Sequence, residues 1–109
     1  MNINWIGQSG QSYAFETHPI GTQFVAFPGV YIFCSSANGT SWAAQYVGET
    51  GDFSERLNRC VTTHHAFARA RSFGATHVGV LRVFGLGQQR RLEIETDLRR
   101  GLRPPANNQ

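Results

Sequence analysis

The chain has 109 residues, of which 40% are hydrophobic and 12% aromatic, with a formal net charge of +3. This size and apolar content suit one compact domain. No apolar run approaches the roughly 18 residues of a membrane-spanning helix, and nothing near the N-terminus resembles a secretory leader, so we expect a soluble, cytoplasmic protein without a membrane partner. Cys34 and Cys60 are too few for a disulfide framework, which predicts buried thiols.

The charge is divided unevenly along the chain. Residues 1–55 carry four carboxylates and no basic side chain, whereas residues 56–109 carry ten arginines against three carboxylates, and there is no lysine. Arginine offers a rigid fork of donors that matches phosphate oxygens, and a basic face speeds the encounter with a polyanion. The second half therefore favours nucleic acid as the partner, and the alternative is a basic surface that only solubilises the protein.

The first 27 residues predict an N-terminal β extension that packs on the sheet of the remaining domain, residues 28–109. The stretch from Ser12 to Thr17 alternates between aromatic and polar residues and indicates a short strand, and Gln23 to Phe27 indicates another. We expect this extension to pair with or cover a sheet edge, because an uncovered edge invites aggregation.

A hairpin is predicted next. Val30 to Cys34 and Trp42 to Val47 are rich in β-branched and aromatic residues and flank a polar cluster from Ser35 to Ser41. Asn38-Gly39 lies inside this cluster and is a dipeptide that prefers a two-residue hairpin turn. The sequence therefore predicts two antiparallel strands joined at Asn38-Gly39.

That turn determines which residues pair across the hairpin. It places Tyr31 opposite Tyr46, so that both phenols lie on one side of the sheet. It also places Gly29 opposite Gly48, which leaves open space where a substrate backbone can approach. A longer loop would shift this register.

The first helix is predicted to begin at Asp52, an N-cap with Glu55 three residues on, as in a capping box. The helix runs to about Cys60 and carries Arg56 at the edge of its apolar arc. We expect Arg56 to reach across the end of the sheet towards the two tyrosines. The alternative is an ordinary surface arginine beside a glutamate.

The second helix is predicted from Thr63 to Phe73, with Gly74 as its C′ residue. His64 and His65 stand at its start. The helical wheel does not separate the two histidines, because they fall on either side of the apolar centre. Either one is a candidate site residue or a solvated residue of the first turn.

The residues from Thr76 to Phe84 are almost continuously apolar, which predicts a central strand covered on both faces. A third helix is predicted from Gln88 to Arg100 and ends at Gly101 before a proline pair. On its wheel Glu95 falls within the apolar arc, while Glu93 points to the opposite side. A carboxylate on a core-facing arc is costly unless it is paired or binds a metal. Glu95 is therefore either a metal ligand or the ion-pair partner of Arg91, one turn back, or Arg99, one turn on.

Taken in order, these features resemble the GIY-YIG endonucleases over residues 28–107. The shared features are two glycine-tyrosine tripeptides, a helix arginine, a histidine, and a glutamate followed by a characteristic tail, here Gly29-Val30-Tyr31, Tyr46-Val47-Gly48, Arg56, His64 or His65, and Glu95 with Leu98, Pro104 and Asn107. The resemblance implies an α/β fold with a three-stranded core sheet flanked by helices, to which the N-terminal β extension is added.

The resemblance also implies a chemistry. It implies hydrolysis of phosphodiester bonds with one Mg²⁺ or Mn²⁺ on Glu95, a tyrosine base, either Tyr31 or Tyr46, and Arg56 on the phosphate. The spacing in small stand-alone relatives points to His64 in preference to His65. The remaining residues that it implies contact the substrate, namely Gly29, Gly48, Arg91 and Asn107. We expect DNA more than RNA as the substrate, while strandedness and assembly as a homodimer or with a partner protein stay open.

One residue departs from the family pattern. Many relatives carry a lysine just after the second tripeptide, where this chain has Glu49. Either an arginine of a later helix replaces that lysine or Glu49 faces away from the substrate. Two rival interpretations are a non-catalytic nucleic-acid-binding module on the same scaffold and a zinc or toxin-like interaction protein using Cys60, His64 and His65, whose spacing matches no standard zinc site.

Overall fold

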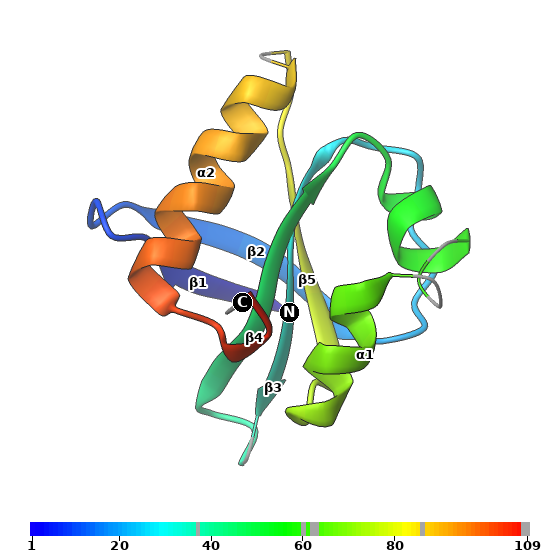
Figure 1. The fold of residues 1–109 in the computed structure, drawn as a ribbon, viewed down its shortest axis with the longest axis vertical. Coiled ribbons are helices and arrows are strands. Elements are labelled where there is room, and N and C mark those ends of the chain that lie inside the picture. The colour runs from blue at the N-terminus through cyan, green and yellow to red at the C-terminus, as the bar shows by residue number, and fades with distance from the viewer. Residues whose placement is uncertain (37, 60, 62–63, 86, 108–109) are drawn as a thin grey trace.

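The computed structural model of this chain is an α/β fold with one curled, five-stranded antiparallel sheet (Figure 1). It describes residues 1–109 except 37, 60, 62–63, 86 and 108–109. The sheet order is β1-β2-β5-β3-β4, and its strands are β1 (Asn2–Ile6), β2 (Ser12–Pro19), β3 (Gly29–Ser36), β4 (Trp42–Thr50) and β5 (His77–Arg82). The helical segments are η1 (Glu55–Arg59), α1 (His65–Ser72), α2 (Gly87–Leu102) and η3 (Pro105–Asn107). Within these described ranges, no helix is both long and apolar enough to cross a membrane.

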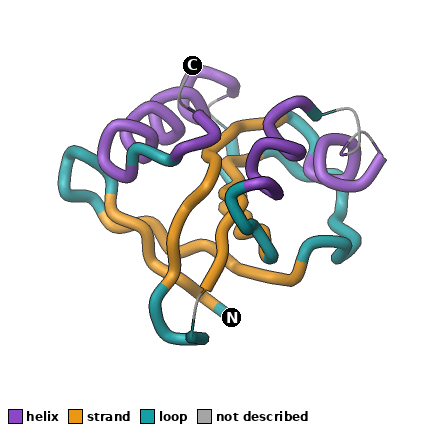
Figure 2. The backbone as a smooth tube through the Cα atoms, turned by 60° about the horizontal axis from the view of Figure 1, so that its bottom comes forward, coloured by secondary structure: helices purple, strands orange, loops and turns teal. Residues whose placement is uncertain are grey.

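Strand β3 connects two hydrophobic cores on opposite faces of the sheet. Its alternating side chains place Val30 and Ile32 in the core beneath α2, and Tyr31 and Phe33 in the core beneath η1 and α1. Figure 2 shows the corresponding arrangement, with α2 on one side of the β3–β4 hairpin and the η1–α1 pair on the other. The first six residues of β3 are therefore buried between the two helical layers, which explains their nearly continuous apolar sequence.

The N-terminal residues extend the sheet. The predicted strand at Ser12–Thr17 is confirmed as β2, which pairs with β5, and β1 pairs with β2 to make the outer edge. The predicted strand from Gln23 to Phe27 is wrong. The backbone there bonds to the first helix instead, because Phe24 N–H donates to the Asn58 side chain and Phe53 N–H donates to the carbonyl of Phe27.

The predicted register of the hairpin is wrong by two residues. Tyr31 pairs with Gly48, and Phe33 rather than Tyr31 pairs with Tyr46. The connection is longer than a two-residue turn, because the Asn38 side chain accepts the backbone N–H groups of Thr40 and Ser41 within an open loop. A bulge after Phe33 adds the remaining offset.

The predicted helices are present, with different ends. Asp52 caps the first helix by accepting the Glu55 N–H at 3.2 Å, as expected, and the chain then forms the π-helical turn η1. The second helix begins at His65, and its predicted start at Thr63, like the predicted helix end at Cys60, lies outside the described residues.

Helix α2 does not end at Gly101 as predicted but continues to Leu102. Gly101 serves close packing instead, because a Cβ there would lie 2.6 Å from the backbone nitrogen of Gln8. The loop between β1 and β2 therefore rests directly on the last turn of α2. This contact positions the C-terminal end of α2 relative to the sheet.

Candidate functional site

The centre of the site is a hydrogen bond between two buried side chains from distant parts of the chain. The Tyr31 hydroxyl on β3 lies 2.6 Å from Nε2 of His64, and these residues are 1% and 3% exposed. His64 is the N-cap of α1, where its Nδ1 accepts the Ala66 N–H at 3.2 Å. His65, the alternative considered above, is exposed. The structure thus brings His64 and not His65 to the tyrosines.

The cap contact determines the direction of the Tyr31–His64 bond. Burial, together with the positive charge of Arg56, lowers the pKa of His64 to about 4, so the ring is neutral at neutral pH. Because Nδ1 accepts the Ala66 N–H, the ring proton resides on Nε2 and is donated to the Tyr31 oxygen. The Tyr31 O–H is consequently directed away from His64.

Tyr46 continues this cluster towards the outside. Its ring centroid lies 6.1 Å from that of Tyr31 and 5.4 Å from that of His64, and the residue is only partly buried. The shifted register keeps both tyrosines on one face, since an offset of two residues preserves the direction of every side chain. The two phenols therefore meet diagonally and not face to face.

The pKa values of both phenols are raised. Burial is the main cause for Tyr31, and the charge of Tyr46 adds to it, although a hydrogen bond from Arg56 acts in the opposite direction. Burial also raises the pKa of Tyr46. A hydrogen bond from the Tyr31 hydroxyl opposes this shift, so the donor chain runs from His64 through Tyr31 to Tyr46.

Arg56 comes from η1, as the sequence predicted, and its backbone N–H donates to the Asp52 carbonyl at 3.1 Å. A π-helical turn is rare and is often found at functional sites. The Arg56 guanidinium acts against the rise in the pKa of Tyr31 through its charge and a hydrogen bond. Its charge also acts against the rise in the pKa of Tyr46. The predicted neighbourhood of Arg56 and the two tyrosines is present in the fold.

Glu95 lies on α2, where its side chain is close to Glu49 of β4. Its side chain is 15% exposed, and burial raises the pKa of its carboxyl while a hydrogen bond from the Glu49 backbone N–H lowers it. Arg99, one turn on, lies 3.8 Å away, a long contact for an ion pair. The charge of Glu95 also raises the pKa of Tyr46, which places the carboxylate within electrostatic reach of the phenols. Glu93, by contrast, is exposed and pairs with Arg90.

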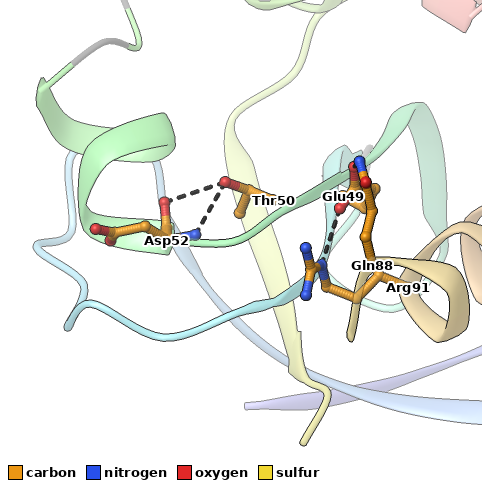
Figure 3. A network of polar contacts seen from close by, with 5 residues as sticks. All are labelled: Glu49, Thr50, Asp52, Gln88 and Arg91. Carbon is orange, nitrogen blue, oxygen red and sulfur yellow. Dashed lines mark hydrogen bonds and ion pairs between the residues drawn. The ribbon is translucent and has the colours of Figure 1, made fainter. Parts of the chain in front are cut away.

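Glu49, the departure from the family pattern, is paired with Arg91. The Glu49 carboxylate accepts the Nε–H of Arg91 at 2.9 Å, and the two side chains are 13% and 14% exposed. Gln88 donates to the other carboxylate oxygen at 3.2 Å, and Figure 3 shows both side chains reaching from α2 to β4. Arg91, implied above as a substrate contact, is therefore held by Glu49 in this structure.

The predicted open space beside the two glycines is wrong. A Cβ on Gly48 would lie 2.5 Å from the Tyr31 hydroxyl oxygen, and a Cβ on Gly29 would lie 2.0 Å from the Leu81 carbonyl oxygen. Gly48 is thus required for the Tyr31 ring to cross β4 beside it. The glycines make room for protein atoms and not for a substrate backbone.

Asn107 closes the edge of the sheet. Its side chain accepts the Val47 N–H at 2.7 Å and donates to the Val47 carbonyl at 2.9 Å, both in buried positions. β4 is the last strand of the sheet, so these groups would otherwise lack partners. The side chain implied as a substrate contact instead holds η3 against β4.

Among the described residues, no group of three or more His, Cys, Asp and Glu side chains comes together as a metal site. The charge of the Glu95 carboxylate acts on both tyrosines. Searches for related proteins found no matching protein-family model, no matching curated protein and no matching solved structure.

Proposed function

We propose that this chain is a metal-dependent endonuclease of the GIY-YIG type that hydrolyses phosphodiester bonds, in DNA more than in RNA. The observation that carries the proposal is the convergence of Tyr31, Tyr46, Arg56, His64 and Glu95. These residues come from five separate segments of the chain, and the family resemblance had singled them out from the sequence. An arginine and a largely buried carboxylate with a raised pKa beside two phenols are typical of a functional site.

The composition of the cluster favours phosphoryl chemistry over acyl transfer. Acyl transfer requires an activated nucleophile beside a base. Cys34 is fully buried, and burial raises the pKa of its thiol to about 12, so it is not a reactive thiolate. Arg56 instead offers a fixed positive charge for the phosphoryl group during the reaction.

The two tyrosines have different tasks in this proposal. Tyr46 is the more accessible phenol, so it is the one that meets the attacking water. Tyr31 is buried and accepts a hydrogen bond from the His64 Nε2–H, so its own hydroxyl proton is free to orient Tyr46. Tyr46 can act as the base only as a phenolate, after its own proton has left to solvent. Burial disfavours that form by raising the pKa, and the charges of Arg56 and Arg99 favour it.

Glu95 fits a divalent cation. Mg²⁺ retains several waters and is commonly held by one or two carboxylates together with substrate phosphate, so a full protein cage is not required. The Glu95 carboxylate is desolvated, and its nearest cation is 3.8 Å away, which leaves it able to accept another positive charge. When bound, such an ion supplies charge stabilisation to the phosphate and the leaving oxygen.

The test is direct cleavage. Purified protein is incubated with single-stranded DNA, double-stranded DNA and RNA, with Mg²⁺ or with EDTA, and products are resolved on a gel. We expect Mg²⁺-dependent cleavage that falls by about 10²-fold or more in Tyr46→Phe. Binding without cleavage on any substrate would instead support the non-catalytic module, and neither binding nor cleavage would reject both.

A further inference from the structure

A cleft of about 610 Å³ opens at the C-terminal end of α2. Three arginines line it, Arg99, Arg100 and Arg103, together with Thr96 and the proline pair that follows the helix. All three belong to the strongly basic second half of the chain, but the sequence analysis singled out only Arg99, as a partner for Glu95. The spacing Arg-Arg-Gly-Leu-Arg at a helix end was the available signal.

The positive charge in this cleft is poorly neutralised. Arg99 has the long contact with Glu95 at 3.8 Å. Arg100 and Arg103 are exposed, and within the described part of the chain neither has an acidic side chain at ion-pair distance. Helix dipole effects favour basic residues in a last turn, but they do not require three of them to share one concave surface.

Arg103 occupies a backbone conformation that favours glycine. Its φ is +49°, and its N–H donates to the Arg99 carbonyl at 2.9 Å, which makes it the left-handed C′ residue of α2. A left-handed conformation is costly for a residue with a Cβ. An arginine at this position therefore reduces stability relative to glycine, which suggests that its side chain has another use.

The cleft adjoins the site described above through Arg99. This residue lies in the cleft and contacts Glu95, and its charge acts on Tyr46. From Glu95 to the end of α2 at Leu102 the helix rises by about 10 Å, at 1.5 Å per residue. In a duplex one strand advances about 3.4 Å per nucleotide, so this distance corresponds to roughly three nucleotides.

We propose that this cleft binds the phosphate backbone of the substrate strand roughly three nucleotides from the bond that is cleaved. The inference rests on the proposed function for the position of that bond. It names the substrate class as a polynucleotide that continues past the cleavage point, in preference to a terminal nucleotide or a mononucleotide ester. Arg100 and Arg103 make the phosphate contacts, and Arg99 connects the cleft to Glu95.

The experiment measures binding separately from cleavage. Affinities of the whole chain for a labelled duplex and for a single strand are measured in EDTA between 50 and 200 mM salt. The variants are Arg103→Gly and Arg100→Gln, and the control is Arg90→Gln, which removes the same charge from α2 outside the cleft. We expect each cleft variant to weaken binding and to reduce the salt slope by about 0.9 on duplex or about 0.7 on single strand.

The Tm of each variant shows whether weaker binding comes from a lost phosphate contact or from a destabilised fold. Arg103→Gly should leave Tm unchanged or raise it, because glycine is favoured at that φ. Weaker binding with Tm retained supports the cleft. A lower Tm in Arg103→Gly, or cleft variants that bind like Arg90→Gln, would overturn it.

Cleavage by the same variants separates this inference from the proposed function. Cleavage by wild type, combined with control-like binding by the cleft variants, would reject the cleft and keep the nuclease. Binding that depends on Arg100 and Arg103 without any cleavage would reject the nuclease and keep a phosphate-binding cleft. With an active wild type, a substrate truncated to one nucleotide on the cleft side should be cleaved more slowly than one with six, and Arg103→Gly should reduce this difference.

Discussion

His64 should make the stability of this protein sensitive to mild acid. The pKa of this buried histidine is lowered from 6.5 to about 4 by burial and by the Arg56 charge. The unfolded chain therefore binds more protons than the folded chain between these values, and stability rises with pH across that window. The contribution of His64 to the free energy of unfolding is complete above about pH 6.5 and is lost as the pH falls towards 4.

The size of the effect follows from this shift. A pKa difference of about 2.5 corresponds to roughly 3 kcal/mol in total, at 1.36 kcal/mol per unit. At pH 5 about 2 kcal/mol of it should already be lost. His64 is 3% exposed, so solvent screening does not reduce this figure appreciably.

The assay is urea unfolding at pH 8 and pH 5 for wild type, His64→Asn and His65→Asn. Asparagine at position 64 keeps a side-chain acceptor for the N-cap contact but does not titrate. Wild type and His65→Asn, which changes the exposed neighbour, should lose about 2 kcal/mol more than His64→Asn on going to pH 5. If His64→Asn showed the same pH dependence as wild type, the buried neutral histidine and the direction of its bond to Tyr31 would be refuted.

Three further predictions concern the same site. Glu95→Gln should abolish Mg²⁺-dependent cleavage while nucleic-acid binding persists, since the desolvated carboxylate loses its charge. The control Glu93→Gln changes an exposed carboxylate and should alter neither cleavage nor binding. Full activity in Glu95→Gln would exclude the proposed role. Gly48→Ala should cost about 1–3 kcal/mol in urea unfolding, because its Cβ would lie 2.5 Å from the Tyr31 ring. Asn107→Ala should cost about 1–3 kcal/mol per unpaired Val47 backbone group, and a loss of nucleic-acid binding at unchanged stability would instead restore Asn107 as a substrate contact.

The Tyr31→Phe variant needs a different expectation from that for Tyr46→Phe. Removing the Tyr31 hydroxyl leaves the buried His64 Nε2–H without its acceptor, which should cost about 1–3 kcal/mol. Tyr46→Phe removes a hydroxyl that is partly exposed to water. Thermal unfolding of both variants should therefore show a larger Tm decrease for Tyr31→Phe, and equal decreases would argue against the buried donor chain.

Local sequence patterns determined much of this fold. β3, β5 and α2 were predicted because their residues satisfy local preferences and bury apolar surface at the same time. The Asp52 cap and the opposite exposures of Glu93 and Glu95 follow from spacing along one helix, which needs no knowledge of distant contacts.

Only the tertiary structure decided the contacts that join distant segments. The hairpin register depends on the backbone N–H groups that the Asn38 side-chain oxygen accepts in the loop, and on a bulge after Phe33. Strand propensity specifies neither of these features. His64 is distinguished from His65 as the site residue because it is buried against Tyr31. Asn107 is the hydrogen-bond partner of an edge strand because β4 is the last strand of the sheet. These outcomes depend on which backbone groups lack partners once the chain is packed, and a linear sequence does not contain that information.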